Sequence, residues 1–209
     1  MATQLAVYQE ALEHLGERPL ASLSEDREPR RALDSAWDTT LTYCLEQGFW
    51  NWALRSVEIE PEPAIDPAFG YQSAFLKPTD WLRTYVVSVN EYFEPALTEF
   101  IDENGYWMTD TDILYARYVS SGADFGLNLS LWPETFSTYV ALRLARRICV
   151  RITNSSEKFG DLVKLEARAK VDAMSKDAMN EGTRKPPPGT WVMSRGSRLT
   201  TSRWNGRFE

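Results

Sequence analysis

The sequence predicts an α+β protein in which a helical bundle, built from both ends of the chain, carries an inserted, mostly antiparallel β-sheet subdomain and an extended C-terminal arm. Apolar residues recur at helical spacing in residues 1–52 and again in 121–183, so both ends contribute to the bundle. In residues 53–120 the apolar spacing falls toward two, which favours strands. Residues 184–209 show no helical stripe and form the predicted arm.

Two helices are predicted in the N-terminal part. The first covers about residues 3–15, because its apolar residues recur at helical spacing and Gly16 can cap its end. The second begins near Pro29, since proline suits the first helical turn, and its apolar stripe is Leu33, Trp37, Leu41, Cys44 and Leu45.

Three large aromatic residues follow this second helix within four positions. They are Phe49, Trp50 and Trp52. Aromatic side chains contribute large buried areas with defined ring geometry. We therefore predict a structural joint here, where helix turns into strand, and we expect Trp50 and Trp52 to be buried.

The central segment reads as short strands separated by turns. Val57 and Ile59 alternate with polar residues, and further runs follow at 71–76, 83–90, 100–103, 106–109 and 113–120. Asn104-Gly105 is a strong signal for a two-residue hairpin. Because the connections are short, we expect an antiparallel sheet whose last strand completes a meander.

Helical spacing returns after Trp132-Pro133 and continues to about Ile152. On this helix Arg143, Arg147 and Arg151 recur every four residues and so share one face. We interpret them as candidates for ion pairs with acidic residues, either between subunits or within the helix; contact with nucleic acid is the alternative.

A long last helix is predicted from a cap at Asn154-Ser155-Ser156-Glu157 to about Gly182. Its expected core stripe is Phe159, Val163, Ala167, Val171, Met174 and Ala178.

Charge is unevenly distributed along the chain. The arm carries six basic residues and one acidic residue, a net +5, whereas the whole chain is −7, so the remainder is −12. Such an arm could dock on an acidic face of a like subunit or on another acidic partner. The predicted partner-binding residues are Arg184, Lys185, Trp191, Arg195, Arg198, Arg203, Trp204, Arg207 and Phe208.

Sequence motifs for catalysis are scarce. The chain has one histidine, His14, and lacks GxxxxGK[ST], GxGxxG and GxSxG patterns. We therefore expect no enzyme activity, no cofactor and no metal site. A glycoside-hydrolysing site built from two carboxylates stays an open alternative, because the chain has 30 acidic residues and the sequence does not single out a pair. No apolar run reaches about 18 residues, so no membrane span is expected.

Several stretches resemble, in order and spacing, the head-to-tail adaptor family of short-tailed bacteriophages, often called tail tubular protein A. In the first third these are ALEHLGE (11–17), PLASL (19–23), RRAL (30–33), Trp37 and FWNWA (49–53). Further along they are Tyr71, AFLKPTDWLR (74–83), ILYARY (113–118) and the helix from Phe136 through Ala141 and Leu144-Ala145. The resemblance covers roughly residues 5 to 180, and the arm departs from it.

This resemblance implies a virion structural protein without catalysis. Such adaptors form a ring, twelvefold in the family, beneath the portal protein; the ring prolongs the DNA channel and is a platform for the tail nozzle, or tail tubular protein B. It implies a homo-oligomer at the head-tail junction of the virion, made in the host bacterial cytoplasm, through which genomic DNA passes without sequence-specific binding. The alternative is a nucleic-acid-binding protein that uses the basic, aromatic arm.

Overall fold

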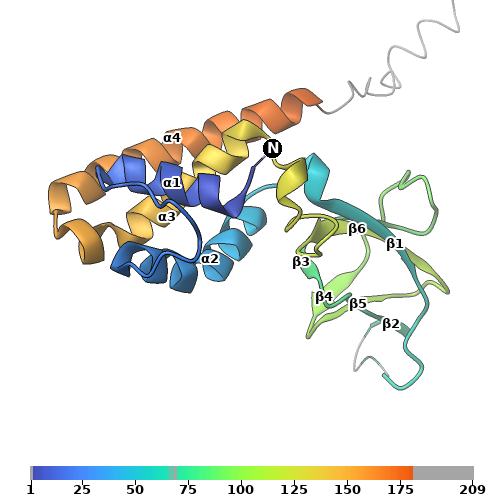
Figure 1. The fold of residues 1–209 in the computed structure, drawn as a ribbon. Helices are drawn as coiled ribbons and strands as arrows, with labels where there is room; N and C mark the ends of the chain where they lie inside the picture. The colour runs from blue at the N-terminus through green and yellow to red at the C-terminus, as the bar shows by residue number, and fades with distance from the viewer. Residues whose placement is uncertain (1, 66, 68–69, 181–209) are drawn as a thin grey trace, which may run out of the picture.

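The structure is a computed structural model that describes residues 2–65, 67 and 70–180. It confirms the α+β class, because the described residues form four α-helices and two antiparallel three-stranded sheets. The helices gather at one end of the molecule and the sheets at the other (Figure 1). The predicted arm, 184–209, lies outside the described residues.

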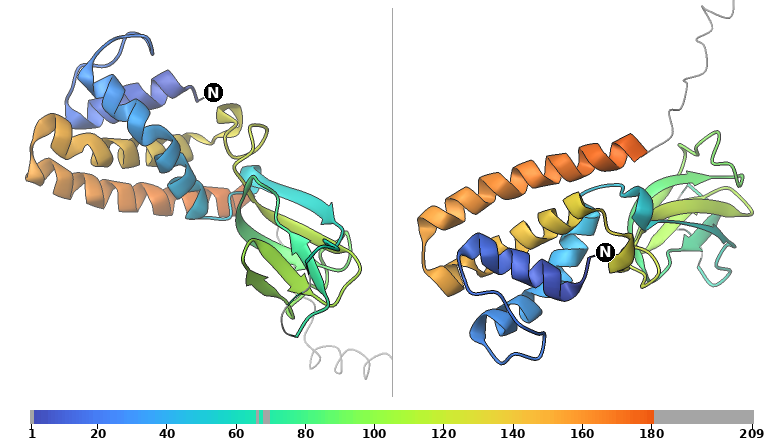
Figure 2. Two further views of the ribbon diagram at one scale, coloured as in Figure 1. Left: turned by 90° about the horizontal axis from the view of Figure 1, so that it is seen from below. Right: turned by 45° about the horizontal axis from the view of Figure 1, so that its top comes forward.

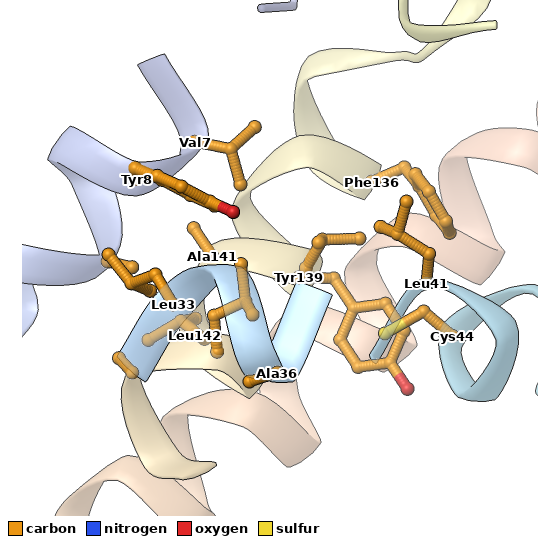
Figure 3. Packing of buried hydrophobic residues seen from close by; sticks show 14 of the residues in the cluster. Val7, Tyr8, Leu33, Ala36, Leu41, Cys44, Phe136, Tyr139, Ala141 and Leu142 are labelled. Atoms are coloured by element: carbon orange, nitrogen blue, oxygen red, sulfur yellow. The ribbon is translucent and has the colours of Figure 1, made fainter. Parts of the chain in front are cut away.

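The helical part is organised around α3. Helices α1 (Gln4–Leu15), α2 (Glu28–Glu46) and α4 (Ser156–Asn180) each pack on α3 (Glu134–Thr153) (Figure 1). The C-terminal end of α2 also reaches α4, where Lys170 donates to the Gln47 side chain at 2.8 Å. Side chains from α1, α2 and α3 converge in the core between them (Figure 3). Helix α3 is therefore the element that the other three share.

Helix ends follow the local chemistry of their residues. The Thr3 hydroxyl accepts a hydrogen bond from the backbone N–H of Ala6 and so caps α1, which ends at Gly16 with φ 69°. Asn154 ends α3 in the same left-handed conformation, with φ 49°. The hydroxyl of the next residue, Ser155, then accepts from the N–H of Lys158 at 3.3 Å, so the predicted cap begins α4.

The strands form two stacked sheets. One has the order β1 (Leu54–Ile59), β6 (Leu114–Ser120), β3 (Trp81–Ser88); the other has β2 (Ser73–Leu76), β5 (Tyr106–Thr109), β4 (Ile101–Glu103). The antiparallel pairing is confirmed, as is the hairpin at Asn104-Gly105, where φ is 48° and 81°.

The predicted meander is wrong, because β6 returns to lie between β1 and β3. Its inward side chains Leu114, Ala116 and Tyr118 then face Phe75 and Trp107 of the second sheet. Stacking two short sheets buries an apolar face of each, whereas a single meander would leave both faces open. Figure 2 shows the resulting sandwich from two further directions.

The predicted stripe of α4 is also wrong for most of its length. Phe159 packs against the helical core, but the exposed residues are Ala167, Val171, Met174 and Ala178. The face turned toward α3 instead buries Leu162, Glu166, Ala173 and Asp177. These two carboxylates can be buried because each has a partner. Glu166 pairs with arginines of α3, and Asp177 accepts from the backbone N–H of Asn51, just after α2.

Candidate functional site

The predicted aromatic joint lies where α2, α3, α4 and β1 meet. Trp50 is only 1% exposed, and its indole N–H donates to the carbonyls of Cys44 and Leu45 at 3.1 and 3.2 Å. It therefore binds carbonyl groups in the last turn of α2, where the Cys44 carbonyl also accepts from the backbone N–H of Gln47 at 3.4 Å. A side chain at Gly48 would approach the Trp50 ring to 3.0 Å, so glycine fits this turn.

Phe136 of α3 is held by both tryptophans of the joint. Trp50 and Trp52 each place a ring centroid 4.8 Å from that of Phe136, in edge-to-face geometry. Trp132 meets the same ring at 5.0 Å. Such pairs add about 0.5–1.5 kcal/mol each beyond their buried area, so the cluster fixes the helical part against the chain that enters β1.

Phe49, the third aromatic of the joint, points elsewhere. It is 37% exposed, contacts Tyr85 of β3 at 5.2 Å, and lies under the guanidinium of Arg83 at 4.0 Å. Arg83 also donates to the carbonyl of Glu46 at 3.3 Å. Phe49 and Arg83 therefore link the end of α2 to the first sheet at the protein surface.

A pocket of about 180 Å³ opens beside the joint. Its lining residues come from the turn after α2, from β3 and from the last turns of α4: Gly48, Phe49, Trp50, Asn51, Tyr85, Met174, Asp177 and Ala178. The carboxylate of Asp177 accepts from the backbone N–H of Asn51 at 3.0 Å, and the Asn51 side chain donates to the Asp177 carbonyl at 3.1 Å. The end of α4 is thereby fixed to the joint.

The arginine row of α3 makes its contacts with other helices of the same chain. Arg143 pairs with Glu166 of α4 at 3.0 Å, Arg147 donates to Thr39 of α2, and Arg151 pairs with Glu28 of α2. These contacts join different helices, so the intrahelical interpretation is wrong, whereas contact of the row with a second subunit stays a prediction.

Sequence reasoning missed the second arginine that Glu166 binds. Arg146 reaches the other carboxylate oxygen at 2.8 Å, and the Glu166 side chain is only 7% exposed. Arg143 in addition lies over the ring of Tyr43 at 3.9 Å. One buried carboxylate thus joins α4 to two turns of α3, and the only available signal was a glutamate at helical spacing from Leu162.

A second polar cluster centres on Asp80, at the start of β3. Its carboxylate accepts from Arg55 and from the Tyr118 hydroxyl, both at 2.9 Å, and from the Ser120 hydroxyl. Burial would raise the pKa of Asp80, but the hydrogen bonds from Ser120, Arg55 and Tyr118 outweigh it and hold that pKa below its ordinary value. The ionised carboxylate therefore ties all three strands of this sheet together.

Lys77 makes the corresponding contact for the second sheet. Its buried ammonium lies 3.6 Å from the ring centroid of Trp81 and 5.5 Å from that of Trp107, and it pairs with Asp102 of β4. A desolvated ammonium gains from both the rings and the carboxylate. Lys77 and Asp80 both belong to the segment 74–83, so that stretch anchors the sandwich.

Groups suited to nucleophilic or metal chemistry do not gather in the described part of the chain. Both cysteines, Cys44 and Cys149, are free and buried. Burial raises the pKa of Cys44 to about 12, so its thiol stays neutral. Among residues 2–65, 67 and 70–180, no group of three or more His, Cys, Asp or Glu side chains could hold a metal ion. No described helix is long and apolar enough to cross a membrane.

The predicted partner-binding residues of the arm, from Arg184 to Phe208, all lie outside the described residues. Comparison with protein-family models and with curated proteins finds no match to this chain. The resemblance to phage adaptors therefore stays a prediction from the sequence. The described site is a set of anchoring contacts that fix a helical part to a β-sandwich.

Proposed function

We propose that this chain is a head-to-tail adaptor subunit of a short-tailed bacteriophage. It assembles into a ring beneath the portal protein, prolongs the DNA channel and offers a platform to the tail nozzle. It acts as a structural protein and catalyses no reaction.

The proposal is supported by the positions, in the fold, of the motifs that resemble the adaptor family. FWNWA (49–53) forms the aromatic joint, and AFLKPTDWLR (74–83) contains both Lys77 and Asp80, which anchor the sandwich. ALEHLGE (11–17) ends α1 and contains its cap, Gly16. The residues that carry the resemblance are thus ones that fix neighbouring elements to each other, as a repeating subunit requires.

Charge distribution also supports an assembly subunit. Residues 1–120 carry 21 acidic and eight basic side chains, a net −13, whereas residues 121–180 carry seven acidic and nine basic ones, a net +2. Copies placed side by side can therefore oppose regions of unlike charge. An acidic channel wall would also repel passing DNA.

The test is reconstitution with the cognate portal protein. The full chain mixed with purified portal should give a ring-shaped complex by electron microscopy, and deletion of residues 184–209 should weaken it. A matched control replaces the six basic residues of the arm by glutamine, which separates the contribution of charge from that of length.

Two outcomes would count against the proposal. Failure of the full chain to bind portal would overturn the adaptor role. A salt-dependent shift of nucleic acid by the isolated chain, lost with the arm, would favour the nucleic-acid-binding alternative instead.

A further inference from the structure

Two neighbouring pockets share Tyr85 of β3 as a lining residue, where the end of α4 meets the β-sandwich. The first is the pocket beside the aromatic joint, and the last two turns of α4 form part of its wall. The second, of about 400 Å³, is lined by Tyr85, Val86, Phe93, Glu94 and Ala96. We call the two pockets together the Tyr85 groove. It runs from the helical part onto the sandwich.

Aromatic and acidic side chains line the groove together. The rings of Phe49, Tyr85 and Phe93 come from separate segments, and Phe49 is still 37% exposed. Glu94 and Asp177 add two carboxylates, and no lysine or arginine is among the described residues that line the two pockets. A surface of this kind fits a segment that carries both aromatic and basic side chains.

The sandwich that forms the second pocket is strongly acidic. Residues 53–120 carry twelve acidic and four basic side chains, a net −8. The four basic residues already have contacts in the chain, as ion pairs or over aromatic rings: Arg55, Lys77, Arg83 and Arg117. Carboxylates are therefore in excess on this part of the molecule, and they attract a basic segment.

The chain leaves α4 at the edge of the groove. Ala178 lines the first pocket and α4 ends two residues later, at the sandwich end of the helical part (Figure 2). The basic arm, net +5, follows, and its first aromatic residue, Trp191, comes eleven positions after Asn180. An extended chain spans about 3.3–3.6 Å per residue, which is ample for Trp191 to reach either of two pockets of this size.

We infer that the C-terminal segment of the same chain, residues 181–209, binds the Tyr85 groove, with Trp191 in the second pocket and cations of the arm beside carboxylates of the sandwich. Because the segment is tethered at the edge of the groove, its effective concentration there is in the millimolar range typical of short linkers. The inference concerns the isolated chain and does not depend on the proposed function. A partner that takes up the arm must displace it from the groove.

The experiment attaches a nitroxide to the arm of the full chain. Ser194→Cys supplies the labelling site, three residues after Trp191, and the two native cysteines do not compete because both are buried. The nitroxide broadens the backbone amide signals of nearby residues in the nuclear magnetic resonance spectrum. Tyr85 and Val86 report on the groove, and Ser155, at the opposite end of the 25-residue helix α4, reports on a distant site.

The groove signals should lose most of their intensity, and the Ser155 signal should keep its own. Trp191→Ala removes the anchoring ring, and Ala96→Arg places a cation in the second pocket, so each should restore the groove signals. Ala64→Arg places the same cation on another exposed loop residue of the sandwich and should leave the broadening unchanged. The dispersion of the amide signals checks that every variant folds.

A mixing experiment identifies the chain that supplies the segment. Isotopically labelled chain without nitroxide is mixed with nitroxide-labelled chain without isotopes, and its groove signals should stay sharp. Broadening in this mixture comparable to that within one chain would mean that a second copy supplies the segment, and it would overturn the inference.

Two further results would overturn it. One is a set of groove signals that the nitroxide leaves sharp in the parent chain. The other is broadening that either Trp191→Ala or Ala96→Arg fails to reduce. Because reconstitution with portal is measured separately, each of these results would leave the proposed adaptor role untouched.

Discussion

The helical part and the β-sandwich are stabilised in different ways. The helical core draws apolar side chains from all four helices and from the aromatic joint. In the described residues the sandwich has a much smaller buried apolar cluster, formed by Phe75, Val87, Trp107, Leu114, Ala116 and Tyr118. Two polar residues beside this cluster, the buried Lys77 and the half-buried Asp80, each have several partners.

This difference follows from the size of the elements. Strands of three to eight residues bury little apolar area, so the sandwich needs hydrogen-bonded and charged contacts to hold one arrangement. Helices of 12 to 25 residues supply a larger core and tolerate charge at their margins. The helical part should therefore respond most to lost apolar volume, and the sandwich to lost charge.

Removing the central tryptophan of the joint should have the largest effect. Trp50→Ala leaves a cavity beside Phe136 and removes the indole hydrogen bonds to the Cys44 and Leu45 carbonyls, so we expect a loss of about 3–5 kcal/mol in the free energy of unfolding, measured by urea denaturation. Phe49→Ala, at a partly exposed ring of the same joint, should cost about 1–2 kcal/mol. Equal losses would mean that the joint does not depend on burial.

Neutralising the buried carboxylate of α4 should come next. Glu166→Gln leaves Arg143 and Arg146 without a charged partner, and we expect a loss of about 2–3 kcal/mol. Glu28→Gln removes the partner of Arg151 in an exposed pair and should cost less than about 1 kcal/mol. If both changes cost the same, the helical part would depend on charge as much as the sandwich does.

The sandwich should lose stability in acid through Asp80. Its pKa is depressed in the folded state, so its contribution is complete above the unfolded value of about 3.9 and disappears as the pH falls through the folded pKa. At neutral pH, Asp80→Asn should cost about 1–2 kcal/mol.

The pH dependence separates this effect from simple loss of packing. The difference between wild type and Asp80→Asn should shrink as the pH is lowered, which urea titrations at several pH values would measure. Asp26→Asn, in an exposed pair with Arg31, provides the control and should be nearly neutral throughout. If the stability difference between wild type and Asp80→Asn stayed constant down to low pH, the stabilising role of the Asp80 charge would be contradicted.

The smallest effect on the isolated chain should come from the outward side of α4. Val171→Ser should change the free energy of unfolding by less than about 0.5 kcal/mol, because this side chain is mostly in water. Leu162→Ala on the inward side of the same helix should cost about 2–3 kcal/mol. A large loss at Val171 would show that the stripe belongs to the core after all.

Local signals made the helices predictable. Thr3, Gly16 and Pro29 set their ends by short-range chemistry that the sequence displays, and most of the expected apolar stripes of α1 and α2 is buried, with Leu5 and Trp37 partly exposed. The hairpin at Asn104-Gly105 is equally local. Strand order was not predictable, because the β1 to β6 pairing joins Leu54 to Val119 across the rest of the sandwich.

The misplaced stripe of α4 has a different cause. Val171 and Met174 have the periodicity of a core face, while the buried face contains Glu166 and Asp177, whose partners lie on other elements. A prediction from periodicity assigns the most hydrophobic side of a helix to the core. It cannot show that a carboxylate on another side has partners that allow its burial. For the same reason the aromatic joint could be located from sequence, whereas the partners of the arginine row and the enclosure of Lys77 could not.

The central position of α3 has a consequence for synthesis of the chain. Helices α1 and α2 complete their packing only on α3, whose residues 134–153 are made after every strand of the sandwich. The first strand likewise waits for β6 before it gains its partner. Contacts so distant in sequence slow folding. The apolar faces of α1 and α2 therefore lack their main partner until α3 has been made, and we expect chaperones to bind the nascent chain during that interval.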